Sequence, residues 1–325
     1  MLSELLKDIM DPYLLGAVAA FVLSLLGLIF GRRFLPKDQG REFAVNGEKS
    51  KGKARGAGII LMLALIVAAI LFVPLSLEYV IYLVAIFFEM LSGYLDDASE
   101  KPWGELVKGI IDLVIAVAVS VTIYMYHGST IQMPSMGLTY TIPAALYIFL
   151  GVVMIWTSIN VTNCADGVDG LCTCLTLTTL GTAFLVLQYV EQNEMRMLVW
   201  LCEFVLIAYL WFNCSPSTML MGDAGSRALG LLIAMAFMVS GMPFLFIPGT
   251  LVLLIDGGLG LVKLTVRRVT KSTTFMDRVR TPIHDHMRRK YEWSDTQVVT
   301  RFTLVQVLQS VGIILLLSYY LTNKA

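Results

Sequence analysis

Ten apolar runs, each close to the length of a membrane span, organise this 325-residue chain. A transmembrane helix needs about 20 mainly apolar residues, with a range of roughly 17–25. Hydrophobic residues make up 57% of the chain and charged residues 15%, which excludes an ordinary soluble domain. The runs lie near residues 13–30, 58–75, 79–95, 109–125, 143–160, 171–190, 197–212, 227–242, 244–266 and 303–321. The sequence therefore predicts an all-α polytopic membrane protein with about ten transmembrane helices, folded as a single integral membrane domain over residues 1–325.

Two stretches depart from the regular pattern of spans. Asp256 and Gly257-Gly258 interrupt the ninth run, so we expect this helix to bend or break there. The segment Tyr126–Tyr140 alternates polar and apolar residues around Pro134-Ser135-Met136-Gly137. Such alternation about a turn predicts a small hairpin between the fourth and fifth spans.

Lysine and arginine gather in the loops on one side of the predicted bundle. Residues 31–57, the pair Lys101 and Lys108, and residues 267–301 together hold 19 of the 24 basic residues. Alternation of ten spans places all three groups on the same side, which the positive-inside rule makes cytoplasmic. The hairpin and both termini are then extracytoplasmic. A net charge of zero, distributed in this way, gives no indication of a nucleic-acid partner.

Polar clusters follow the spans that run from the outside inward. They are Asp96-Asp97 after the third, Asn163, Asp166 and Asp169 after the fifth, Asn213 and Asp223 after the seventh, and His284 and His286 after the ninth. Ionisable residues held this close to hydrocarbon are costly, so they are candidates for a functional site. Segments far apart in sequence thus deliver carboxylates to one membrane face, which is how a metal–phosphate site would be built.

The aspartates suit a magnesium site, although each cluster also has a plainer interpretation. Mg²⁺ is usually held by one or two carboxylates together with substrate phosphates, and Asp223, between two glycines at the start of a helix, is an attractive place for such a site. Asp166 and Asp169 are spaced i and i+3, on one face of a helical turn. The alternatives are a charged helix end at Asp96-Asp97 and a helix N-cap at Asp169.

The two histidines lie within three positions of each other in the largest basic loop. A zinc pair is the less favoured interpretation of His284 and His286, because no cysteine or third histidine stands nearby at a suitable spacing. Recognition of a phosphate or a base fits them better. Four lysines supply cations near the same face: Lys51, Lys53, Lys101 and Lys108.

Five motifs occur in an order that resembles a known family. They are Leu95-Asp96-Asp97, Asn163-x-x-Asp166-Gly-x-Asp169-Gly170-Leu171, Phe212-Asn213-x-x-Pro216, Gly222-Asp223-x-Gly225-Ser226 and Pro282-Ile283-His284-x-His286. The chain resembles the polyprenyl-phosphate N-acetylhexosamine-1-phosphate transferases and, within them, the phospho-N-acetylmuramoyl-pentapeptide transferases. Any one motif is weak evidence, but five in order are specific, and the likeness covers essentially the whole chain.

The resemblance implies an enzyme of peptidoglycan synthesis in the bacterial plasma membrane. Such an enzyme transfers phospho-MurNAc-pentapeptide from UDP-MurNAc-pentapeptide to undecaprenyl phosphate, giving lipid I and UMP with Mg²⁺ as cofactor. A homodimer embedded among membrane lipids is compatible with it. The residues implied as catalytic are Asp96, Asp97, Asp223 and His284, with Asp223 and Asp97 as the expected ligands of the metal. The residues implied as substrate-binding are Lys51, Lys108, Asn163, Asp166, Asp169, Asn213 and His286.

Departures from the family pattern keep a second donor open. His284-Asp285-His286 stands where three consecutive histidines are usual, and Glu100 stands where a lysine is usual. Gly52-Lys53-Ala54-Arg55-Gly56-Ala57-Gly58 replaces the usual Gly-Thr-Pro-Thr-Met-Gly-Gly. The alternative is a sister transferase that loads GlcNAc-1-phosphate from UDP-GlcNAc. A more distant alternative, an ion-coupled transporter, would place acids near mid-bilayer and on both faces.

Overall fold

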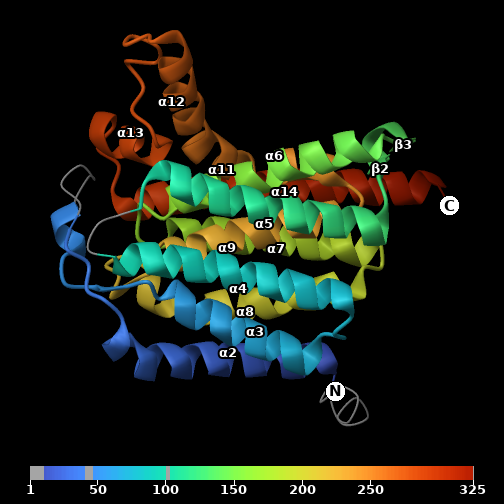
Figure 1. The fold of residues 1–325 in the computed structure, drawn as a ribbon, viewed down its shortest axis with the longest axis horizontal. Helices are drawn as coiled ribbons and strands as arrows, with labels where there is room; N and C mark the ends of the chain where they lie inside the picture. The colour runs from blue at the N-terminus through green and yellow to red at the C-terminus, as the bar shows by residue number, and fades with distance from the viewer. Residues whose placement is uncertain (1–10, 41–46, 100–102, 325) are drawn as a thin grey trace.

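Long helices lying side by side make up most of the computed structural model (Figure 1). The structure describes residues 11–40, 47–99 and 103–324, so Arg41, Glu100 and Lys101 lie outside the described residues. The helices are α2 (Pro12–Gly31), α3 (Gly58–Phe72), α4 (Leu77–Ala98), α5 (Glu105–His127), α6 (Ala144–Ala165), α7 (Leu171–Tyr189), α8 (Asn193–Asn213), α9 (Asp223–Val239), α10 (Phe246–Gly249), α11 (Leu251–Leu253), α12 (Leu259–Thr270), α13 (Ile283–Lys290) and α14 (Asp295–Lys324). The predicted all-α membrane fold is confirmed.

The number of membrane-crossing helices is lower by length and hydropathy than the ten runs predicted. Seven helices in the described ranges are long and apolar enough to cross a membrane, or eight if one bent pair counts as a single span. The two other predicted spans form α3, with 15 residues, and α9, with 17. Helix α3 ends three residues before its apolar run does, whereas α9 begins and ends earlier in the chain than its run. The figure of ten spans stays a prediction.

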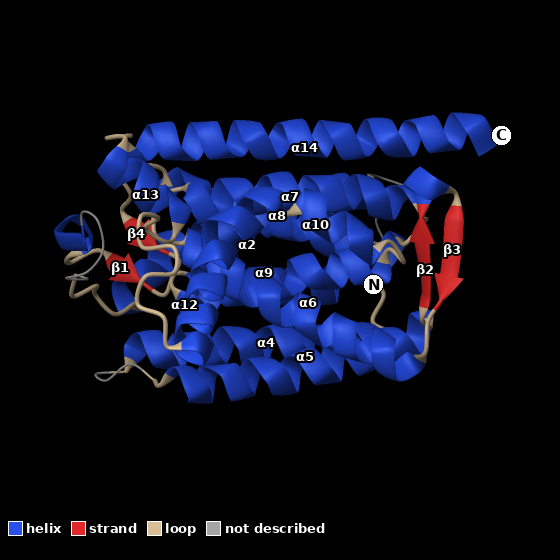
Figure 2. Cartoon of the chain, turned by 90° about the horizontal axis from the view of Figure 1, so that it is seen from above, coloured by secondary structure: helices blue, strands red, loops and turns tan. Residues whose placement is uncertain are grey.

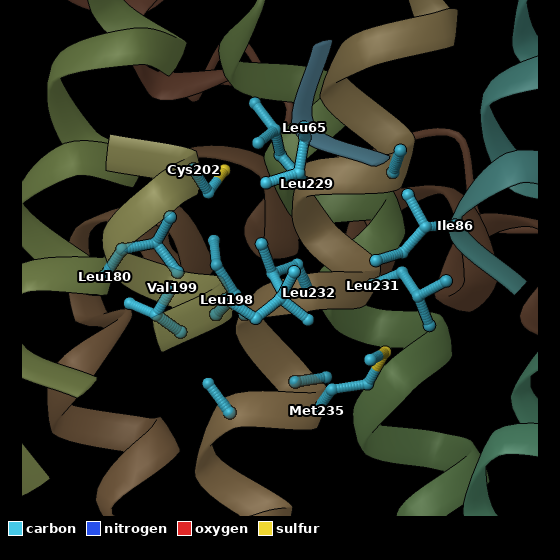
Figure 3. Packing of buried hydrophobic residues seen from close by; sticks show 14 of the residues in the cluster. Leu65, Ile86, Leu180, Leu198, Val199, Cys202, Leu229, Leu231, Leu232 and Met235 are labelled. Carbon is cyan, nitrogen blue, oxygen red and sulfur yellow. The ribbon is translucent and has the colours of Figure 1, made fainter. Parts of the chain in front are cut away.

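Helix α9 lies at the centre of the bundle. All 17 of its residues are buried, and it contacts α3, α4, α5, α6, α7 and α8. Figure 3 shows its apolar side chains packed among those of the surrounding helices; the labelled residues are Leu65, Ile86, Leu180, Leu198, Val199, Cys202, Leu229, Leu231, Leu232 and Met235. A lipid-facing helix would expose part of its surface, so α9 is the axis around which the outer helices are placed.

The predicted interruption of the ninth span is present, but the sharp bend lies earlier than expected. Pro243–Gly249 and Leu251–Thr270 meet at 67°, which places the break at Thr250. The side chain of Gln306 satisfies the freed backbone there: its Nε2 donates to the Gly249 carbonyl at 2.7 Å, and its Oε1 accepts from the Val252 amide at 3.2 Å. Backbone groups in a membrane must be paired in this way. Asp256 lies in a π-helical turn, Leu254–Gly258, and the helical segment Leu251–Thr270 continues through this turn.

Short strands mark the two ends of the bundle (Figure 2). At one end, β1 (Ala54–Arg55) pairs in parallel with β4 (Met219–Leu220), near α13. At the other end, β2 (Thr130–Met133) and β3 (Leu138–Thr141) pair antiparallel, in the segment for which the sequence predicts a hairpin. Helix α2 begins and α14 ends at the hairpin end (Figure 1). The polar clusters therefore lie at the end opposite to the termini.

Candidate active site

The site is centred where the last turn of α4 meets the first turn of α9. The two backbones touch at Gly93: a Cβ atom there would lie 2.4 Å from the carbonyl carbon of Asp223. One turn further on, Oδ2 of Asp97 accepts a hydrogen bond from the Asp223 amide at 2.7 Å. A carboxylate at a helix N-terminus is favourable because free amides and the helix dipole point toward it. Asp97 thus caps α9 from a neighbouring helix.

Lys108, on the first turns of α5, lies between two aspartates. Its Nζ contacts Oδ2 of Asp96 closely and lies 3.2 Å from Oδ2 of Asp223. The other carboxylate oxygen of Asp96 accepts from the Trp103 amide at 2.6 Å. Asp96 and Asp97 are adjacent in sequence, yet they bind different partners around the same centre: Asp96 holds Lys108, and Asp97 holds the start of α9.

Arg55 completes this group from the loop that precedes α3. The pairing of β1 with β4 carries Arg55 to the segment just before Asp223. Its Nη2 lies 2.8 Å from Oδ1 of Asp97, and its Nη1 lies 3.3 Å from Oδ2 of the buried Asp38. Burial lowers the pKa of Arg55, but the carboxylates of Asp97, Asp223 and Asp38 outweigh that effect and raise it. Arg55 therefore remains a fixed positive charge beside the two candidate ligands.

The segment after α6 adds two more aspartates to the rim. Oδ2 of Asp166 accepts from the Gly222 amide at 3.0 Å. Oδ2 of Asp169 accepts from the Ser217 amide at 2.8 Å and lies 3.3 Å from Nζ of Lys53. Asn163 reaches α9 directly, because its Nδ2 donates to Oγ of Ser226 at 2.9 Å. These contacts join the end of α6 to the loop that carries Asp223.

The two histidines of α13 face different surroundings. His284 is 2% exposed; its Nδ1 lies 2.8 Å from Oδ2 of Asp256, and its backbone amide donates to Oδ1 of Asp256 at 2.7 Å. Its Nε2 faces Gly167, where an added Cβ would lie only 2.7 Å away. By contrast, Nδ1 of His286 accepts from the Arg280 amide at 3.2 Å. His286 thus holds the loop before α13, and its role in binding substrate stays a prediction.

Asn213 braces the protein from inside, and the substrate contact expected from the sequence stays a prediction. Its Oδ1 accepts from the Gly170 amide at 3.1 Å and from Oγ1 of Thr173 at 3.0 Å. Its Nδ2 donates to the Met219 carbonyl at 3.2 Å, and the residue is 3% exposed. The amide group is therefore engaged inside the protein, where it fixes the start of α7 to β4.

Two further corrections concern residues that the sequence placed differently. Asp256, which was expected to break the ninth span, is fully buried against His284. Lys51 is exposed, whereas Lys53, two residues later, contacts the cluster. Lys53 and Arg55 belong to the stretch that departs from the family's usual glycine-rich sequence, and that departure was the available signal. Nothing in the local sequence distinguished Lys51 from Lys53.

The charge and the number of the carboxylates at the site determine whether they can hold a magnesium ion. In the ranges that the structure describes, no three His, Cys, Asp or Glu side chains converge as an enclosing metal site. Four carboxylates, from Asp38, Asp96, Asp97 and Asp223, share two cationic side chains, from Arg55 and Lys108. The excess of negative charge fits a divalent cation bound through one or two carboxylates, with substrate phosphates supplying further oxygens.

The pair Lys51 and Lys53 gives a matched test of these positions. We expect Lys53→Ala to raise the KM for a phosphorylated donor by on the order of 10-fold, because it removes a charge held against Asp169. Lys51→Ala removes the same charge from an exposed position and should have a smaller effect. The measurement is the KM of both variants from steady-state kinetics. A larger increase in KM for Lys51→Ala than for Lys53→Ala would favour Lys51 as the substrate-binding residue, as expected from the sequence.

Comparison with known proteins gives the family. The model of glycosyl transferase family 4 matches residues 79–241, which run from α4 to the end of α9. A phospho-N-acetylmuramoyl-pentapeptide-transferase of Treponema pallidum is 37% identical over 301 residues, covering 87% of this chain and 83% of the relative. Proteins of the same name from Clostridium perfringens and Dictyoglomus turgidum are 30% and 27% identical, covering 94% of this chain in each case and 97% and 99% of the relatives. The chain therefore belongs to glycosyl transferase family 4 and, within it, to the phospho-N-acetylmuramoyl-pentapeptide transferases.

Proposed function

We propose that this protein transfers phospho-MurNAc-pentapeptide from UDP-MurNAc-pentapeptide to undecaprenyl phosphate, giving lipid I and UMP. Family membership makes it a phosphoglycosyl transferase. The observation that carries the proposal is the meeting of Asp97 and Asp223 at the start of α9, with Lys108 and Arg55 against them. Carboxylates and fixed cations together are what a reaction between two phosphate groups requires.

The chemistry explains why both signs of charge are present. The lipid phosphate and the pyrophosphate of the donor are both anions, so they must be neutralised and aligned before they can react. Lys108 is held by Asp96 and Asp223, which positions its ammonium to receive phosphate oxygens. Arg55 and Lys53 extend this positive surface from the neighbouring loop. Asp96 or Asp97 would accept the proton of the attacking lipid phosphate.

Asp223 and Asp97 are the residues that would hold magnesium in this proposal. When bound, Mg²⁺ supplies further neutralisation of the phosphate oxygens and of the departing UMP. Asp97 also caps α9 through Oδ2, while its Oδ1 accepts from Arg55, so one carboxylate group joins the helix to a fixed cation. Asp166 and Asp169 keep the loop before Asp223 in place through the amides of Gly222 and Ser217.

The location of the site supports a reaction at the cytoplasmic face of the bacterial plasma membrane. The site shares its end of the bundle with α13 and the basic loops, opposite to the β2–β3 hairpin and to both termini (Figures 1 and 2). A cytoplasmic site admits the water-soluble nucleotide, while the lipid tail can lie along the broken ninth helix. Both termini are extracytoplasmic in this orientation.

The choice of donor is the direct test of the proposed function. Purified protein in detergent, supplied with Mg²⁺ and undecaprenyl phosphate, should form a labelled lipid pyrophosphate from UDP-MurNAc-pentapeptide and release UMP. We expect UDP-GlcNAc to give at most about one-hundredth of that kcat/KM, because a site that binds the peptide loses those contacts with the smaller sugar. Preferential use of UDP-GlcNAc would instead assign the protein to the sister reaction that the altered His284-Asp285-His286 motif leaves open.

A further inference from the structure

Three charged side chains meet inside the bundle, within two helical turns of the candidate site. They are Glu89 on α4, Asp112 on α5 and Arg227 on α9, and each is at most 3% exposed. Nε of Arg227 donates to Oε1 of Glu89 at 2.9 Å, and its Nη2 donates to Oδ1 of Asp112. Charges at such depth are expensive, and well-packed apolar residues would serve stability as well or better. Their presence therefore calls for a role other than stabilisation.

Each member of this triad shares its helix with a member of the site. Asp96 and Glu89 lie on α4, seven residues and two turns apart; Lys108 and Asp112 lie on α5, four residues apart. Asp223 and Arg227 lie on α9, also four residues apart, and α5 and α9 both begin at the site end. Helices α5 and α9 thus face each other through two ion pairs that lie one helical turn apart. We call the pair at the site the upper rung and the pair one turn deeper in the bundle the lower rung. The positive charge belongs to α5 in the upper rung and to α9 in the lower rung.

We propose that Glu89, Asp112 and Arg227 are positioning residues, which fix the axial register of α5 against α9 and so place Lys108 between Asp96 and Asp223. The upper rung pairs Lys108 with Asp223, and the lower rung pairs Asp112 with Arg227. A slip of α5 by one turn in one direction brings Lys108 opposite Arg227; a slip in the other direction brings Asp112 opposite Asp223. Either slip sets like charges together, so only the observed register satisfies both rungs.

Helix α5 needs such a device more than α4 does. Gly93 brings α4 into backbone contact with α9, and this interlocking sets their register sterically. Gly109 of α5 has no neighbour within 4 Å of an added Cβ, and Leu106 and Val114 are 77% and 63% exposed. In lipid, apolar surface alone does not hold one helix to another, because the tails are equally apolar. The close steric contact of α5 is made with α6, where an added Cβ at Gly151 would lie 2.3 Å from Oγ of Ser120. The register of α5 against α9 therefore depends on the polar contacts between these two helices.

This inference rests on the proposed transferase site, and Asp112→Asn is its main test. The variant leaves Arg227 paired with Glu89 while it removes the charge of the lower rung from α5. We expect kcat to fall by on the order of 10- to 100-fold, because a small displacement of Lys108 misaligns the phosphates. KM for both substrates should change by no more than about 2-fold. The control is Ser120→Ala, which removes a hydrogen bond of α5 to the Ile148 carbonyl without touching α9.

A second measurement reads the register without any activity. The rate at which an amine-reactive acylating reagent modifies Lys108, followed by mass spectrometry of the peptide, should rise severalfold in Asp112→Asn and stay unchanged in Ser120→Ala. An unchanged rate at Lys108 in Asp112→Asn would overturn the proposal, whatever happens to kcat. If the wild-type protein proves to catalyse a different reaction, the labelling contrast still decides the register, so the two failures are distinguishable.

The complete apolar replacement separates positioning from stabilisation. In Glu89→Met/Asp112→Leu/Arg227→Met, the thermal midpoint should equal or exceed that of the wild type, whereas Lys108 labelling should be fast and kcat low. A variant that is as stable and as active as the wild type would refute the positioning role. Should this variant fail to fold, Asp112→Asn alone decides.

Discussion

Asp223→Asn is expected to reduce transfer by on the order of a thousandfold, because it removes the carboxylate around which the other charges are arranged. Oδ2 of Asp223 lies 3.2 Å from Nζ of Lys108, and the backbone amide of Asp223 donates to Asp97. A carboxamide side chain lacks the negative charge that binds a magnesium ion and that attracts Lys108. The N-terminal cap of α9 is unaffected, since it depends on the backbone of residue 223. The variant should therefore insert and fold.

The measurement is the initial rate of lipid product formation over a Mg²⁺ titration, together with the thermal midpoint in detergent. Glu105→Gln is the matched control: it removes a carboxylate from the same end of the bundle, but one that is exposed and paired with Arg268. The control should retain wild-type turnover. Near-normal turnover in Asp223→Asn would move the metal to another residue.

The arrangement of the spans and of the acidic clusters was predictable from the sequence because it follows from hydropathy and alternation. A run of apolar residues identifies a helix, and alternation of direction brings Asp97, Asp166 and Asp223 to one end. Their individual contacts with the amides of Gly222 and Asp223 were not predicted. The membrane fold itself required only composition and length.

Other features depended on contacts that no local pattern encodes. The bend of the ninth span lies at Thr250 because Gln306, more than fifty residues later, accepts and donates the hydrogen bonds that the break frees. Lys53 rather than Lys51 reaches Asp169, since the turn before β1 sets which lysine points inward. His284 is buried against Asp256, and that pairing joins two segments separated by 28 residues.

Asp96→Asn and Asp97→Asn should differ in kind, because the two adjacent aspartates hold different partners. Asp97 accepts from both Arg55 and the Asp223 amide, through different oxygens. An asparagine has one acceptor oxygen, so it would lose one of these partners and turn an NH₂ group toward it. We expect Asp97→Asn to lower kcat by on the order of 100-fold or more and to raise the Mg²⁺ concentration needed for half-maximal rate.

Asp96 contacts Lys108, and we assign it to the part of the site that binds the acceptor lipid phosphate. Its Oδ1 accepts from the Trp103 amide, which an asparagine can still satisfy, but the charge opposite Lys108 is lost. Asp96 as the general base would accept the proton of the attacking lipid phosphate. Asp96→Asn should then show a low kcat, while the Mg²⁺ requirement stays nearly unchanged. The assays are pH–rate profiles and Mg²⁺ titrations of both single variants and the double variant, at saturating concentrations of both substrates. Identical profiles in the two single variants would remove the division of labour, and full activity in all three would leave this pair as no more than a charged helix end.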